Sequence, residues 1–146
     1  MNKSNRVLLI IAIFTGLLLV SSLFLISSKD IKKLDPATPE GVVQLYLNEV
    51  INGQYEEAIN YLSATSNCKA TDLDRAYLAD SLRINLVSSE INEESALVKI
   101  EVETQSGGPF NDSYTESHNY RLAIENTNWK ILGIPWPMWE CGLVTK

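Results

Sequence analysis

One uninterrupted apolar run, from Val7 to Ile26, constrains the fold of this chain more than any other feature of its sequence. The run reads VLLIIAIFTGLLLVSSLFLI and contains no charged residue. A helix rises about 1.5 Å per residue, so these twenty residues would extend about 30 Å, the thickness of a membrane's hydrocarbon core. A helix buried in a soluble protein is rarely apolar on all sides over this length. The run therefore predicts a transmembrane helix.

The flanks of the run favour an uncleaved anchor. Lys3 and Arg6 precede it, and the first helix of a chain usually leaves a short tail of this kind in the cytoplasm. A cleaved signal peptide is the alternative, but its apolar segment is usually shorter and ends in a small-residue cleavage site. We expect residues 1–28 to form a cytoplasmic tip and transmembrane signal-anchor, 29–37 a tether, and 38–146 an extracytoplasmic domain of a cell-membrane protein.

The charge of the outer part argues against a nucleic-acid partner. All eighteen acidic residues lie beyond Ser28, against ten of the twelve Lys and Arg, which gives this part a net charge of −8. Binding to phosphates needs a basic face, and an anionic bilayer surface would repel such a domain as well. The simplest interpretation of the acidic charge is plain solubility.

Three segments after the tether have the apolar spacing and end signals of helices. In the first, TPEGVVQLYLNEVING, Thr38 can cap the helix, Pro39 fits its first turn and Gly53 fits its C-terminal cap. The second is GQYEEAINYLS. The third is DLDRAYLADSL, where we expect Thr71 to open the helix and Asp74 to make a capping-box contact.

From Arg83 the apolar period changes to two, which is typical of half-buried strands. Four strands are expected, with a tight turn before the last one and an irregular, proline-rich tail after it. The buried face of the first strand should carry Ile84, Leu86 and Ser88, and that of the second Val98, Ile100 and Val102. The third strand is expected over 114–125 and the fourth over 129–134.

Helices followed by an antiparallel meander predict an α+β domain, with three helices on one face of the sheet. The opening helix pair, TPEGVVQLYLNEVINGQYEEAINYLS, and the closing strand, NWKILGI, are similar to those of the nuclear transport factor 2-like superfamily. The resemblance covers residues 39–134 and is greatest to small bacterial membrane-tethered members of unknown function. It implies a cone-shaped fold with about four strands curved around a pocket. That superfamily includes isomerases, dehydratases and polyketide cyclases, and also members that only bind or assemble.

His118, the only histidine, is the strongest candidate for chemistry in such a pocket. Histidine titrates near neutral pH and can serve as a general base. Glu116 and Tyr120 share its strand face, and Tyr46 and Tyr77 from the helices could line the same pocket. Alternatively, His118 is a structural residue, and Glu116 lies at the exposed start of the strand because carboxylates are rarely buried.

Cys68 and Cys141 are the only cysteines, and both lie in the outer part. Outside the cytoplasm such a pair favours a disulfide, which would join the tail to the helical layer. A reactive thiol is the alternative. One His and two distant Cys do not make a zinc cluster, so we expect no metal, and no motif predicts a cofactor.

Trp136, Met138 and Trp139, separated by Pro137, form an aromatic patch in the tail. It could be a platform for a ligand, a surface for a protein partner or a contact with the bilayer interface. The alternative is a plug that closes the open end of the cone.

Two classes of function follow. The first is a membrane-anchored extracytoplasmic binding or assembly module without catalytic activity, whose partner is a small ligand, an envelope protein or a second copy. A dimer could use the charged sheet face that bears Lys99, Glu101, Glu103, Arg121 and Glu125. The second is a pocket enzyme of the isomerase or dehydratase type that uses His118, with Glu116 as its partner.

Overall fold

The computed structural model describes residues 11–17, 32–75, 82–105, 113–135 and 141–142, and the chain forms two compact units, Met1–Lys32 and Lys33–Lys146. In the first unit residues 11–17 are helical, and the Thr15 hydroxyl donates to the carbonyl of Ile11 at 3.0 Å. The rest of the expected anchor lies outside the described residues. Among the residues that are described, none of the helices combines the length and apolar character needed to span a membrane.

Helix α2, Pro39–Ile51, confirms the first expected helix and its end signals. The Thr38 hydroxyl accepts a hydrogen bond from the Gly41 N–H at 3.2 Å, which satisfies one of the free donors of the first turn. At the other end Gly53 has a φ of 72°. Its N–H donates to Val50, and the N–H of Gln54 donates to Glu49, so the helix ends in a Schellman motif.

The second expected helix is shorter than its sequence pattern, and the third can be compared with its pattern as far as Arg75. The second is α3, Tyr55–Ala58, followed by the 3₁₀ turns η1, Ile59–Tyr61, and η2, Ala64–Ser66. Helix α4, Ala70–Leu73, begins one residue before Thr71, so the predicted cap was wrong. Its first turn is capped by the carboxylate of Asp72, which accepts from the Lys69 N–H at 2.9 Å, and not by Asp74. Residues 76–81, with Tyr77, lie outside the described residues.

The main sheet has four antiparallel strands in the order β1-β2-β3-β4, which confirms the predicted meander. Its strands are β1, Leu82–Asn92; β2, Ser95–Gln105; β3, Ser113–Glu125; and β4, Asn128–Ile131. Asn126 and Thr127 join the last two with positive φ at both positions, as a type I′ hairpin turn requires.

The predicted last strand, 129–134, is split at Leu132. Its second part is β5, Gly133–Ile134, which pairs with β6, Cys141–Gly142, in a separate two-stranded sheet. The tail is therefore less irregular than expected at this point. A side chain at Gly142 would overlap the carbonyl of Leu132, so only glycine allows the two strands to approach so closely.

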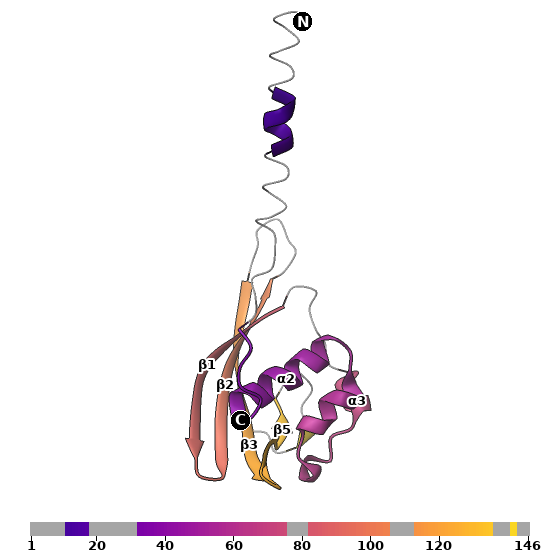
Figure 1. The fold of residues 1–146 in the computed structure, drawn as a ribbon. Helices are drawn as coiled ribbons and strands as arrows, with labels where there is room; N and C mark the ends of the chain where they lie inside the picture. Colours follow the sequence, from indigo (N-terminus) through magenta and orange to yellow (C-terminus); the bar gives the residue numbers. More distant parts are fainter. Residues whose placement is uncertain (1–10, 18–31, 76–81, 106–112, 136–140, 143–146) are drawn as a thin grey trace, which may run out of the picture. The chain divides into compact units, whose positions relative to one another are not determined.

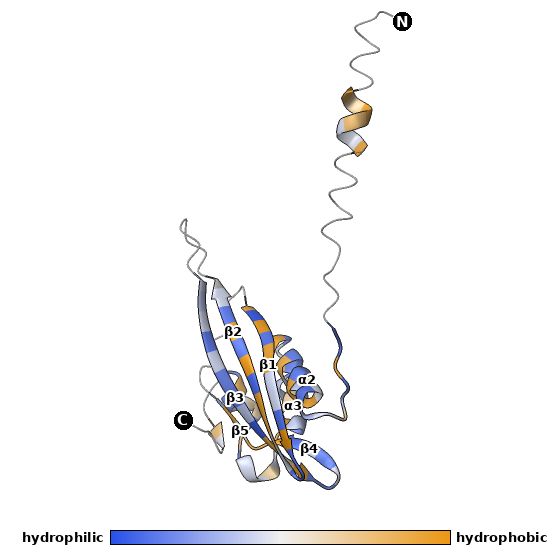
Figure 2. Cartoon of the chain, turned by 90° about the vertical axis from the view of Figure 1, so that its left-hand side faces the viewer, coloured by the Kyte–Doolittle hydropathy of each residue, from blue (hydrophilic) through white to orange (hydrophobic). Residues whose placement is uncertain are grey.

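The core lies between α2 and one face of the main sheet, as Figures 1 and 2 show from two sides. Among the described helices, α2 packs directly on the strands of the main sheet, while α3 packs against α2 and α4. The expected alternation in β2 is confirmed, since Val98, Ile100 and Val102 are all buried. Opposite them, α2 contributes three buried side chains at helical spacing, Val43, Tyr46 and Val50.

Strand β1 departs from its predicted alternation. Leu86 pairs with Ile100, but Ser88 pairs with Lys99, so a β-bulge at Val87 inserts one extra residue. After the bulge the face that bears the core side chains continues with Ser89 and Ile91, and not with Ser88. One inserted residue is enough to exchange the two faces of a strand.

Candidate polar site beneath helix α2

Strand β3 brings the predicted pocket residues onto the face that α2 covers. Glu116, His118 and Tyr120 lie opposite Val102, Ile100 and Val98 of β2, which are buried apolar residues. Burial deepens along the strand: the Glu116 side chain is 31% exposed, His118 8%, and Tyr120 is fully buried. The site therefore runs from a half-exposed carboxylate into the core.

His118 and Glu116 form the charged end of this site. The imidazole Nε2 lies 3.5 Å from Glu116 Oε2, close enough for electrostatic interaction. Among the described residues this nitrogen has no hydrogen-bond partner. Burial lowers the pKa of His118 below its ordinary value, although the nearby Glu116 carboxylate acts in the opposite direction. The imidazole is therefore neutral near pH 7.

Two tyrosines form the buried end. The rings of Tyr46, from α2, and Tyr120, from β3, have centroids 6.0 Å apart and are tilted by 59°, an arrangement that favours contact between ring edge and face. Both hydroxyls are buried and without a hydrogen-bond partner among the described residues. Burial raises the pKa of both phenols well above the ordinary value. Each phenol therefore stays protonated and can donate a hydrogen bond.

The structure thus unites Tyr46, Glu116, His118 and Tyr120 from the expected pocket. The expected aromatic patch, Trp136, Met138 and Trp139, lies outside the described residues, as does Tyr77. The sequence predicted these residues as members of one pocket, but it did not predict the contact between Tyr46 and Tyr120. The sequence features that point to this contact are the apolar face of the first helix and the change from polar to apolar residues along one face of the third strand.

The buried imidazole makes the stability of the domain depend on pH. The pKa of His118 is lower in the folded state than the unfolded value of about 6.5. The unfolded chain therefore takes up the proton first as pH falls, and protonation favours unfolding. We expect the free energy of unfolding to be highest above about pH 6.5 and to fall as pH drops through the folded-state pKa.

Denaturant titrations between pH 7.5 and 5 would measure this dependence, with His118→Gln as the control. The carboxylates titrate in both proteins, so the difference between the two slopes isolates the histidine. Equal slopes would contradict a buried, neutral imidazole.

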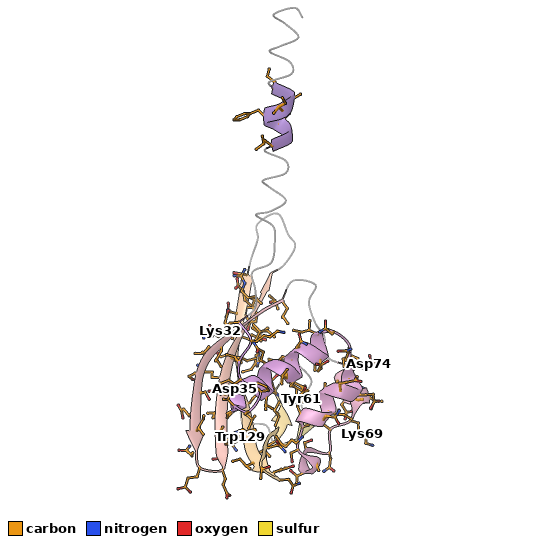
Figure 3. The ribbon with its side chains drawn as sticks, viewed as in Figure 1. Lys32, Asp35, Tyr61, Lys69, Asp74 and Trp129 are labelled. Atoms are coloured by element: carbon orange, nitrogen blue, oxygen red, sulfur yellow. A yellow bond between two sulfur atoms is a disulfide. The ribbon has the colours of Figure 1, made fainter. Side chains whose placement is uncertain are left out.

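A cleft elsewhere in the domain was not predicted from the sequence. It is an open cleft of about 430 Å³ between the start of α3 and α4. Asp74, which is labelled in Figure 3, contributes to it together with Glu56 and Glu57. Within the described part of the chain, no group of His, Cys, Asp and Glu side chains is arranged to hold a metal ion.

The predicted disulfide between Cys68 and Cys141 is present, with Cα atoms 5.8 Å apart. It joins the segment between η2 and α4 to β6, so it ties the end of the chain to the helical side of the domain. Both cysteines pack against the apolar core.

Comparison with known proteins shows a likeness of fold alone. Neither a protein family profile nor a curated protein matches the sequence. The structure is similar to that of a SEC-C motif containing protein from Rhodopseudomonas palustris, with a TM-score of 0.53 and 10% identity over 67% of this chain and 77% of that chain. A weaker match is a protein described as an NTF2-like transpeptidase from Campylobacter jejuni, with a TM-score of 0.43 and 17% identity over 64% of this chain and 96% of that chain. At such identities a common fold carries no information about activity.

Proposed function

We propose that this chain is a membrane-anchored extracytoplasmic module that binds a small polar ligand beneath α2. One observation carries the proposal: three buried polar atoms on the same side of the core, Tyr46 Oη, Tyr120 Oη and His118 Nε2, have no hydrogen-bond partner among the described residues. Each buried polar group without a partner costs about 1–3 kcal/mol. A ligand that bonds to them would recover this free energy.

The side chains limit the chemistry of that ligand. The two phenols supply donors, so the ligand needs acceptor oxygens or nitrogens at its buried end. Glu116 lies at the half-exposed end and would repel an anion. A neutral or cationic molecule with carbonyl, ether or hydroxyl oxygens fits this arrangement best.

Three observations support the proposed location and fold family. The run from Val7 to Ile26 has the length and composition of a membrane span. The disulfide between Cys68 and Cys141 favours an oxidising compartment outside the cytoplasm. The helix pair and closing strand resemble the membrane-tethered nuclear transport factor 2-like proteins, in which a sheet curves around a pocket.

The binding proposal can be tested by native mass spectrometry of the full chain in detergent micelles. We expect extra mass on the wild-type protein that is lost on gentle activation and absent from Tyr120→Phe. The control is Tyr114→Phe, on the same strand, because the Tyr114 side chain is 64% exposed. Without ligand, Tyr120→Phe should be as stable as wild type or more stable by about 1 kcal/mol, since it removes an unsatisfied hydroxyl.

A clearly less stable Tyr120→Phe protein, with no bound species in wild type, would contradict the proposal. The hydroxyl would then be satisfied inside the protein, and the cluster would be structural.

A catalytic alternative rests on the pairing of His118 with Glu116. A neutral imidazole 3.5 Å from a carboxylate has the components of a general base with an orienting partner. This would suit an isomerase or dehydratase. If the protein is an enzyme, wild type should convert the bound ligand, whereas the His118→Gln variant should bind the ligand without converting it. If the protein is a binding module, wild type should leave the ligand unchanged as well.

A further inference from the structure

We propose that a second copy of this chain docks along β1, so that the β1 strands of the two copies pair antiparallel and the main sheet continues from one copy into the other. The two-fold axis would pass through the bulge at Leu86 and Val87. This pairing does not depend on a ligand at His118. It differs from a dimer through the charged sheet face, because it uses the edge of the sheet.

The two edges of the main sheet differ in protection. At the β4 edge the chain returns alongside the strand: the Ser63 N–H donates to the Ile131 carbonyl at 2.7 Å, and the Ser63 hydroxyl donates to Glu125. At the other edge, β1 pairs only with β2 among the described residues. An open edge strand of eleven residues presents a row of free backbone donors and acceptors to another strand.

Strand β1 also exposes more apolar surface than a solvated edge needs. Leu86, Val87 and Ile91 are 47%, 45% and 54% exposed. Edge strands that avoid association are usually short or rich in charge. Within β1 only Arg83 and Glu90 are charged.

The bulge limits the registers in which two β1 strands can pair with matching faces. Residues opposite each other in an antiparallel pair point to the same face of the sheet. In β1 the core-side residues are Leu82 and Ile84 before the bulge but Ser89 and Ile91 after it. An axis between Leu86 and Val87 therefore places core-side residues opposite core-side residues.

In the same arrangement the charges are complementary. Arg83 of each copy lies opposite Glu90 of the other, on the face away from α2, and this pair occurs twice about the axis. Leu82 lies opposite Ile91, which is an apolar pair. Arg83 is 62% exposed and 3.7 Å from Glu103 of its own chain, a surface pair that contributes little by itself. Its guanidinium keeps further donors for the partner.

Charge reversal tests this pairing on the full chain in detergent micelles, with the dissociation constant measured by sedimentation velocity over a concentration series. We expect wild type to dimerise, and Arg83→Glu or Glu90→Arg to weaken the dimer about tenfold or more, because each places like charges opposite each other twice. The double variant Arg83→Glu/Glu90→Arg should restore the dimer. The dimer should also weaken at higher salt.

The control is Arg121→Glu, which changes a charge on β3 far from the edge and should leave the edge dimer unchanged. Each other outcome overturns the proposal. If wild type is monomeric, a second copy of the chain is not the partner of β1. A dimer that resists both single variants is held by another part of the chain, and a dimer lost only in Arg121→Glu uses the sheet face. If the double variant is folded but does not restore the dimer, Arg83 does not lie opposite Glu90, and the proposed register is excluded.

Discussion

Replacing Cys68 and Cys141 together with alanine is expected to lower the free energy of unfolding by about 4 kcal/mol. The cysteines are 73 residues apart in the sequence, and in the chain-entropy model a closed loop of this length restricts the unfolded chain by about that amount. The loss is comparable to a large part of the stability of a small domain. Urea titration of both proteins would measure it.

Reduction of the wild-type protein serves as the matched control, because it opens the same link without changing a side chain. The double variant should be insensitive to reductant, and reduced wild type should approach its stability. A reduced protein as stable as the oxidised one would show that packing alone holds β6 in place.

Replacing Gly41 with alanine is expected to destabilise the domain by about 2 kcal/mol, although alanine is the better helix former. A Cβ at Gly41 would overlap the carbonyl oxygen of Asp35. That carbonyl cannot move freely, since it accepts from the Thr38 N–H at 3.0 Å and from the Thr38 hydroxyl at 2.9 Å. Overpacking costs about 1–3 kcal/mol or more, whereas the gain in helix propensity is about 1 kcal/mol.

Gly53→Ala is the control for this substitution. A Cβ at Gly53 would meet no neighbouring atom, so only the positive φ of 72° opposes a side chain there. Holding alanine at this φ costs about 1 kcal/mol. Thermal unfolding of the three proteins should rank wild type first, Gly53→Ala second and Gly41→Ala last. A Gly41→Ala protein more stable than wild type would mean that the turn at Asp35 yields to the new methyl group.

Local patterns predicted those parts of the fold whose causes are local. Helix α2 follows from its cap at Thr38, its apolar spacing and its terminal glycine. Strand β2 follows from strict alternation, and a tight turn was expected over Glu125–Asn128, although its positive φ at Asn126 and Thr127 was not predicted. In each case the residues that specify the element lie within it.

The predictions that were wrong concern elements whose ends or registers depend on contacts between distant segments. The second helix is cut short because the chain turns at Leu62 to run beside Ile131 of β4. The last strand divides because its first part, β4, pairs with β3, whereas its second part, β5, pairs with β6. The bulge in β1 has no signal in its own residues, and it appears only when β1 is paired with β2.

The candidate site was predicted in part for the same reason. Alternation along β3 placed Glu116, His118 and Tyr120 on one face correctly. It could not give the order of burial along that face or the edge-to-face contact between Tyr46 and Tyr120, since both depend on where α2 crosses the sheet.

The disulfide has a consequence for damage to the backbone. Every strand of the main sheet lies between Cys68 and Cys141 in the sequence, so the sheet belongs to a closed covalent ring. A single proteolytic cut anywhere in that ring adds the mass of one water but releases no fragment. Electrophoresis without reductant would show one band for the nicked protein, and two would separate only after reduction. In an environment that contains proteases, the domain could therefore survive one cut as a single molecule.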